Sequence, residues 1–219
     1  DRMLKEFPMY LENEFLNHFN KDKAAFSTGK NLLSFQMANE LTKRFLESER
    51  EFLLKQTEPV FIEYLEVELI EPIELEINGS KKSFKLKGLI DRVDSIGGKI
   101  RIVDYKSGKV KEEDVFVKIG KSDDDYYKKF TTTKHALQLT MYSYLYRSRY
   151  GVLPKEVGIF SLINISNGFF ALDTNKGMTL EEITDAFPEV LQELFSEMYD
   201  TEIPFEHTIQ QFSYCNYCK

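Results

Sequence analysis

Apolar residues recur at helical spacing in the first quarter of the chain. Charged residues separate them, which predicts a long helix over residues 30–56 with apolar positions at Leu33, Met37, Leu41, Phe45 and Phe52. Residues 8–20 also have a helical pattern, and Pro59 ends the region. We therefore expect an N-terminal helical segment over residues 1–58, followed by a second unit over 59–219.

After Pro59 the pattern changes to alternation. Residues 60–77 alternate apolar and acidic side chains on both sides of Pro72, which predicts two extended segments. Asn78-Gly79 is a turn signal, and residues 83–94 and 99–106 are predicted strands. Between these strands stand Gly97 and Gly98. Because both positions of such a loop accept positive φ, this pair strongly indicates a β-hairpin.

The second half of the chain contains fewer strands. Residues 109–134 are polar, and we expect a mobile connection or flap there. The apolar pattern predicts a helix over 135–149, and Asn167-Gly168 predicts a second hairpin that joins 156–164 to 168–172.

A last helix is predicted to begin at Thr179, because Thr179 and Glu182 have the spacing of a capping box. It reaches about residue 199, and Pro188 is expected to kink or divide it. The order of elements predicts an α/β fold with a central mixed β-sheet flanked by helices.

The Gly97-Gly98 turn also predicts which residues of the first hairpin face each other. Residues whose numbers sum to 195 should pair, which places Asp91 opposite Asp104, with Cβ atoms about 4.5–5.5 Å apart. Like charges so placed destabilise a sheet, and a bound divalent cation would neutralise them. Lys106 leaves the same face two residues later. The alternative is a surface hairpin in which Asp104 pairs with Lys106 or Arg92; the flanking glycines and apolar neighbours favour the metal site.

Composition limits the class of protein. The 219 residues are 42% hydrophobic and 30% charged, as in soluble globular proteins. No apolar run approaches the roughly 20 residues that span a bilayer, and the N-terminus lacks a signal-peptide pattern, so we expect a cytoplasmic protein. Position 1 is not Met, and we expect the chain to be a fragment of a longer one.

The distribution of charge is uneven. A net charge of −7 argues against a simple nucleic-acid coat, yet residues 79–134 hold 15 Lys/Arg and 9 Asp/Glu. A polyanionic substrate would require positive charge near the reacting groups. The alternative, a lysine-rich hairpin that is merely solvated, is equally compatible with the charge alone.

Two carboxylates and a lysine on one face suit phosphodiester hydrolysis assisted by Mg²⁺ or Mn²⁺, which prefer oxygen ligands. Such an ion lowers the pKa of a bound water and polarises the phosphate. Lys106 would then orient that water or stabilise charge on the pentacovalent phosphorus.

Three ordered motifs resemble those of a known family. Gly88-x-x-Asp91-Arg-x-Asp94, Asp104-Tyr-Lys106-Ser-Gly108 and Gln138-x-x-x-Tyr142 closely resemble the PD-(D/E)XK nuclease superfamily. The likeness is greatest to its RecB-like branch, which includes the nuclease domains of RecB and AddB helicase–nucleases, and it covers roughly residues 30–219.

The resemblance implies a role for each matched residue. Asp91, Asp104 and the Tyr105 carbonyl would hold the metal ion, and Lys106 would be the catalytic lysine. Gln138 and Tyr142 would contact DNA or order the metal-bound water; ordinary helix packing is the alternative for both.

An upstream acid is also expected in this branch, and Glu68 is our candidate. A solvated strand face is the equally probable alternative for it.

Two departures from the branch affect cofactors. Its usual metal-binding His, in a Gly-x-x-x-His context, is absent; we expect His18 to be a surface residue and the ligand-bearing helix to precede residue 1. Several relatives also carry a four-cysteine iron–sulfur staple. Cys215-x-x-Cys218 resembles its C-terminal part, but two thiolates cannot complete a [4Fe–4S] site, so we expect a cluster only in a longer chain and a mobile tail here.

These observations lead to two hypotheses. The first is a metal-dependent DNA nuclease, the exonuclease domain of a DNA-repair or recombination helicase–nuclease. The second is a non-catalytic DNA-binding or scaffold module on the same fold that supports a partner helicase; intact Asp91, Asp104 and Lys106 disfavour it.

Overall fold

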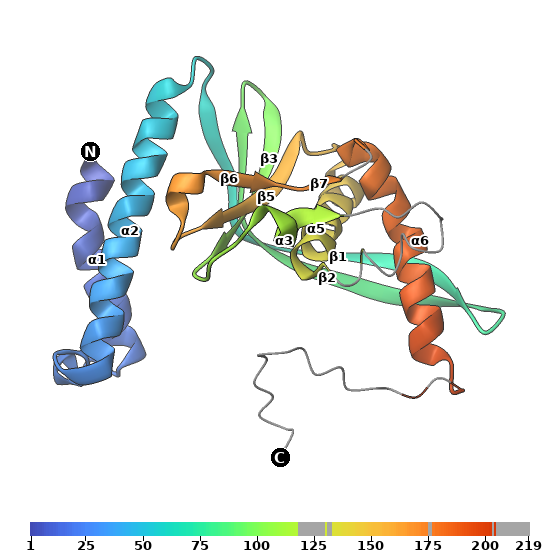
Figure 1. Ribbon diagram of the computed structural model, residues 1–219, viewed down its shortest axis with the longest axis horizontal. Coiled ribbons are helices and arrows are strands. Elements are labelled where there is room, and N and C mark those ends of the chain that lie inside the picture. The colour runs from blue at the N-terminus through green and yellow to red at the C-terminus, as the bar shows by residue number, and fades with distance from the viewer. Residues whose placement is uncertain (118–129, 131–132, 175–176, 203, 205–219) are drawn as a thin grey trace.

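The computed structural model describes residues 1–117, 130, 133–174, 177–202 and 204. A five-stranded sheet of order β1-β2-β3-β5-β6 forms its centre. Figure 1 shows α1 and α2 beside one another at one end of the molecule, α5 across the sheet, and α6 at the other end. The predicted α/β fold, with a central mixed sheet flanked by helices, is confirmed.

Two helices and a short 3₁₀ turn make up the N-terminal segment: α1 (Arg2–His18), η1 (Lys23–Phe26) and α2 (Gly29–Lys55). An aromatic cluster of Phe15, Phe19, Phe26 and Phe35 holds them together, with ring centroids 4.9–6.3 Å apart. The predicted helix over 30–56 agrees with α2, and α1 begins several residues before the predicted start at residue 8.

The first hairpin forms as the Gly-Gly turn predicts. Strands β2 (Ser80–Ile96) and β3 (Lys99–Lys106) are antiparallel, and their register runs from Ile96↔Lys99 to Arg92↔Val103. Gly97 and Gly98 have φ of 56° and 78°, the left-handed values that a two-residue turn of this type requires.

The prediction of two extended segments around Pro72 is wrong. β1 (Val60–Ile77) is one strand that pairs with β2 along its whole length, including Pro72↔Lys85. β1 lies at one edge of the sheet, where the missing N–H of a proline interrupts no second ladder.

The remaining strands complete a mixed sheet. β5 (Glu156–Ser161) runs parallel to β3, and β6 (Phe169–Ala171) returns antiparallel to β5. The two predicted partners of this second hairpin are correct, but the connection is longer than an Asn-Gly turn. It contains the 3₁₀ turn η2 (Ile165–Asn167).

Part of the expected flap is ordered secondary structure. Residues 109–134 include α3 (Glu112–Val115) and β4 (Phe116–Val117), and β4 pairs in parallel with β7 (Asp173–Thr174). The rest of the predicted flap lies outside the described residues, apart from its last few positions.

Two helices cover the sheet and form the core. α5 (Lys134–Tyr150) and α6 (Leu180–Tyr199) pack with β1, β2, β3 and β5 around fully buried apolar residues that include Ile90, Ile102, Leu139, Leu145 and Ile159. Thr179 and Glu182 form the predicted capping box, and Pro188 lies inside one continuous helix rather than dividing it. Within the described parts of the chain, no helix is both long and apolar enough to cross a membrane.

Candidate active site

Asp91 and Asp104 lie one step beyond the last regular pair of the β2–β3 ladder, Arg92↔Val103. The hairpin register therefore places them opposite each other, as the sequence predicts. Oδ2 of Asp91 accepts a hydrogen bond of 2.7 Å from the backbone N–H of Tyr105, the residue that follows Asp104. This bond fixes the Asp91 carboxylate against β3.

β2 departs from regular alternation at Asp91. Ile90 and Val93 are both completely buried in the same core cluster, although residues three apart in a regular strand face opposite ways. Across the strand pair, Glu66 has φ of 50°, in the left-handed region. Irregularities of this kind re-aim side chains, and here Asp91 faces the same side of the sheet as Asp104.

Asp104 is buried and already has one positively charged neighbour. Its Oδ2 lies 2.6 Å from Nζ of Lys106, and the residue is 2% exposed. Burial raises the pKa of Asp104, the ion pair with Lys106 opposes that rise, and the nearby charge of Asp91 adds to it. The pairing of Asp104 with Lys106 that was the alternative to a metal site is therefore present, together with the facing carboxylate.

Helix α5 brings the third motif to this pair. Nε2 of Gln138 donates a 2.8 Å hydrogen bond to Oη of Tyr142, so the two residues share a helix face as their spacing predicts. Burial and the nearby charge of Asp104 raise the pKa of Tyr142 to about 12. The phenol is therefore a hydrogen-bond donor at neutral pH.

The absence of a side chain at Gly88 allows α5 to pack closely against β2. A Cβ atom at this position would lie 2.8 Å from Cδ1 of Leu145 and 3.2 Å from two ring atoms of Tyr142. The first glycine of the Gly88-x-x-Asp91 motif is thus a packing requirement that sets Tyr142 beside the carboxylates.

His135 was missed by the sequence analysis. It lies one turn before Gln138 on α5, and its Nδ1 is buried without a hydrogen bond. Burial, followed by the charge of Lys106, lowers its pKa, while the charges of Asp114 and Asp104 oppose this. The i, i+3 spacing to Gln138 is the signal that could have identified it.

Three other predicted positions lie elsewhere. The Glu68 carboxylate pairs with Lys87 at 2.5 Å on the outer face of the hairpin, and the structure does not bring it to the Asp pair. His18 is exposed at the end of α1, as expected, with its ring against Phe19. Cys215 and Cys218 lie outside the described residues, so their role stays a prediction.

The chemistry of the pair suits a divalent cation. Two carboxylates face each other, one of them buried, and Lys106 supplies a single positive charge beside Asp104. In the described part of the chain, no three acidic, histidine or cysteine side chains are close enough to hold a metal ion. Among the described residues, a cation here would have the two carboxylates as its acidic ligands, and the part of the Tyr105 carbonyl stays a prediction.

A buried charge network occupies the opposite face of the hairpin. Arg92 pairs with Glu49 of α2 at 2.6 Å and with Asp94 at 2.7 Å. Arg101 makes a bidentate contact with Asp94, at 2.9 and 2.8 Å. These four charges balance one another, so Arg92 and Arg101 do not belong to the basic surface that the charge count of residues 79–134 implied.

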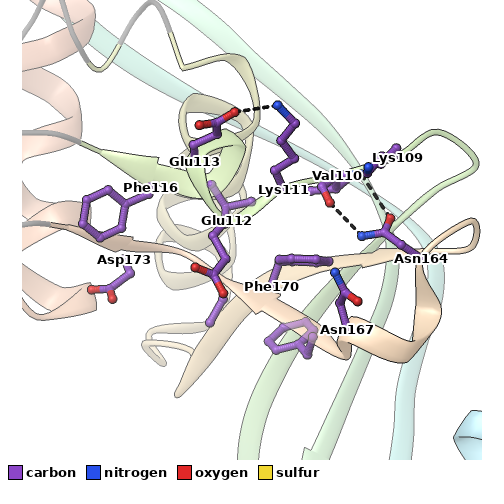
Figure 2. A pocket seen from close by; sticks show the side chains of 13 residues that line it. Lys109, Val110, Lys111, Glu112, Glu113, Phe116, Asn164, Asn167, Phe170 and Asp173 are labelled. Atoms are coloured by element: carbon purple, nitrogen blue, oxygen red, sulfur yellow. Dashed lines mark hydrogen bonds and ion pairs between the residues drawn. The ribbon is translucent and has the colours of Figure 1, made fainter.

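A hollow of about 930 Å³ lies beside the hairpin rather than over the Asp pair. Figure 2 shows Lys111 paired with Glu113, and Asn164 hydrogen-bonded to both backbone groups of Val110. Two lysines and three acids line the hollow: Lys109, Lys111, Glu112, Glu113 and Asp173. Because these charges are not predominantly positive, the hollow does not have the character of a polyanion groove.

Comparison with protein-family models identifies the family of this chain. No curated protein matches the chain in sequence. A family model described as the PD-(D/E)XK nuclease superfamily matches residues 6–219, which include all three motifs. The chain therefore belongs to the PD-(D/E)XK nuclease superfamily.

Proposed function

We propose that this protein is a metal-dependent DNA nuclease that hydrolyses phosphodiester bonds at the Asp91/Asp104 pair. The observation that carries the proposal is the side-by-side placement of two carboxylates and Lys106 at the end of the hairpin, with Tyr142 of α5 near them. Family membership supports nuclease activity.

Asp91, Asp104 and the Tyr105 carbonyl would hold Mg²⁺ or Mn²⁺. The ion, when bound, activates a water molecule and polarises the phosphate. The Tyr105 N–H keeps the Asp91 carboxylate turned toward β3, and burial keeps Asp104 in one position. During hydrolysis the water oxygen bonds to phosphorus, and one P–O bond breaks to give a phosphate monoester and a hydroxyl.

Lys106 would stabilise the negative charge that develops on the phosphate oxygens. Its Nζ lies 2.6 Å from Oδ2 of Asp104, which supports this role. Tyr142 stays protonated at neutral pH and, held by Gln138, could donate to a phosphate oxygen or to the attacking water.

The finer assignment is to the RecB-like branch, as the exonuclease domain of a DNA-repair or recombination helicase–nuclease. The Asp91-Arg-x-Asp94, Asp104-Tyr-Lys106 and Gln138-x-x-x-Tyr142 motifs support it. The network that joins Arg92, Asp94 and Arg101 gives the second Asp of the first motif a structural role. We keep an iron–sulfur cluster at Cys215 and Cys218 as a property of a longer chain only.

The test is cleavage of end-labelled linear DNA, matched closed circular DNA and RNA, with Mg²⁺, Mn²⁺ or EDTA. We expect metal-dependent loss of the linear DNA, with the circle resistant. Degradation of the circle would make the enzyme an endonuclease, and preference for RNA would overturn the DNA assignment. DNA binding without cleavage in either metal would favour the non-catalytic module.

A further inference from the structure

We infer that Glu49 of α2 is a positioning residue of the active site, which acts through Arg92 and Tyr105 on the residues that face the substrate. The inference rests on the nuclease function proposed above. It concerns a residue outside the three motifs, in the N-terminal helical segment.

Tyr105 makes contacts on both faces of the hairpin, with its backbone on one side and its side chain on the other. Its backbone N–H holds Oδ2 of Asp91 on the substrate side. Its Oη accepts a hydrogen bond of 3.1 Å from Nη1 of Arg92 on the other side. The same Nη1 donates to Oε2 of Glu49 at 2.6 Å, so one guanidinium nitrogen joins α2 to Tyr105.

The side chains in this chain of contacts are largely buried. The side chains of Arg92 and Glu49 are 7% and 13% exposed. Phe45 of α2 packs edge-on against the Tyr105 ring with centroids 5.2 Å apart, and Phe52 of α2 lies under the Arg101 guanidinium at 4.6 Å. Removal of Glu49 would leave Arg92 with Asp94 and Tyr105 as its partners in this network.

Asp94 cannot replace Glu49 in this role. Asp94 already accepts the bidentate contact from Arg101 in addition to its contact with Arg92 Nη2. Its Oδ2 contacts Nη2 of Arg92, whereas Nη1 is the nitrogen that contacts Tyr105. Loss of Glu49 would remove one of the two contacts that hold Nη1 of Arg92. The Tyr105 side chain would then be held less firmly, and with it the Tyr105 backbone between Asp104 and Lys106.

The experiment compares Glu49→Ala and Glu49→Gln with wild type. Gln keeps an oxygen that Arg92 can donate to but removes the charge, so it should retain part of the function. The control is Glu47→Ala, which removes an exposed carboxylate of the same helix from its pair with Lys43. Val190→Ala in α6 is a second control, because it destabilises a buried position away from the network.

Two quantities are measured at a temperature where circular dichroism shows every variant folded. They are the Mn²⁺ dissociation constant, by isothermal titration, and the kcat and KM for linear DNA. We expect Glu49→Ala to weaken Mn²⁺ binding about tenfold or more and to lower kcat by a similar factor with KM little changed, as for outer partners of metal ligands. Glu49→Gln should lie between Ala and wild type, and both controls should match wild type in Mn²⁺ affinity.

A double-mutant cycle with Tyr105→Phe tests the route. If Glu49 acts through the Tyr105 hydroxyl, the two losses are less than additive. Wild-type Mn²⁺ affinity and kcat in Glu49→Ala, or full additivity in the cycle, would overturn the inference and leave the proposed function intact. A wild-type protein that neither cleaves DNA nor binds Mn²⁺ would overturn both.

Discussion

Nζ of Lys106 lies 2.6 Å from Oδ2 of Asp104, so an internal cation already neutralises one of the two facing carboxylates. The lysine and a metal ion would share the charge of the same side chain. A lysine in this position can have two roles. It can hold the metal ligand in place, or it can stabilise charge on the substrate.

We predict that Lys106→Ala lowers the cleavage rate about 10²-fold or more, the scale of a lost oxyanion donor. Mn²⁺ affinity should be equal to that of wild type or higher, because a competing positive charge next to Asp104 is gone. Single-turnover kinetics and Mn²⁺ titration measure the two effects. Lys99→Ala at the exposed turn is the control, and a collapse of Mn²⁺ affinity together with the rate would make Lys106 structural.

Removal of a facing carboxylate should separate activity from stability. We predict that Asp104→Asn abolishes cleavage and weakens Mn²⁺ binding. In EDTA its free energy of unfolding should equal or slightly exceed that of wild type. The raised pKa of Asp104 indicates that burial and the charge of Asp91 outweigh the ion pair with Lys106, which the substitution also removes. Urea unfolding in EDTA measures this, with Asp173→Ala as the exposed control. Wild-type cleavage by Asp104→Asn would refute the metal-ligand assignment.

The close approach at Gly88 gives a packing prediction. Gly88→Ala would place a methyl group 2.8 Å from Leu145 and 3.2 Å from Tyr142, which should lower the free energy of unfolding by about 1–3 kcal/mol. Cleavage should also slow, because the added methyl group would displace α5 and move Tyr142 away from the carboxylates. Gly108→Ala is the matched control, since nothing lies within 4 Å of its added Cβ. An unchanged unfolding midpoint in Gly88→Ala would contradict the packing argument.

The capping box of α6 gives a pH prediction. Hydrogen bonds from Thr179, first its backbone N–H and then its hydroxyl, lower the pKa of Glu182. The folded-state pKa therefore lies below the unfolded value. The stabilisation by Glu182 is present above the unfolded pKa and is lost as the pH falls through the folded pKa.

Thr179→Ala should accordingly lower the free energy of unfolding by about 1 kcal/mol at neutral pH. The difference from wild type should shrink at a pH below the folded pKa of Glu182. Urea unfolding over a series of pH values from 7 downward measures this, with Glu193→Gln in the same helix as the control. A difference that stays constant over the whole series would show that Glu182 takes no part in the cap.

The hairpin was predictable because its information is local. Gly97 and Gly98 specify the turn, the turn specifies the register, and the register brings Asp91 to Asp104. Pro72 misled the prediction because sequence alone does not reveal that β1 is an edge strand, where proline is tolerated.

The contacts made across long sequence separations were not predictable. Glu49 lies 43 residues from Arg92, and no periodicity of α2 distinguishes it from the exposed glutamates of the same helix. His135 has a local signal in its spacing to Gln138, but only the packing of α5 over the hairpin gives that spacing a meaning.

Successive residues of β3 serve opposite sides of the sheet. Asp104 and Lys106 face the site, whereas Arg101 and Tyr105 contact the groups beneath α2. A shift of the strand by a single residue would exchange the two sets, so that an arginine and a tyrosine would meet the substrate and the acid would be buried against aromatic rings. Insertion or deletion of one residue at the Gly97-Gly98 turn should therefore harm this protein more than most point substitutions, and evolutionary changes in chain length should avoid this hairpin.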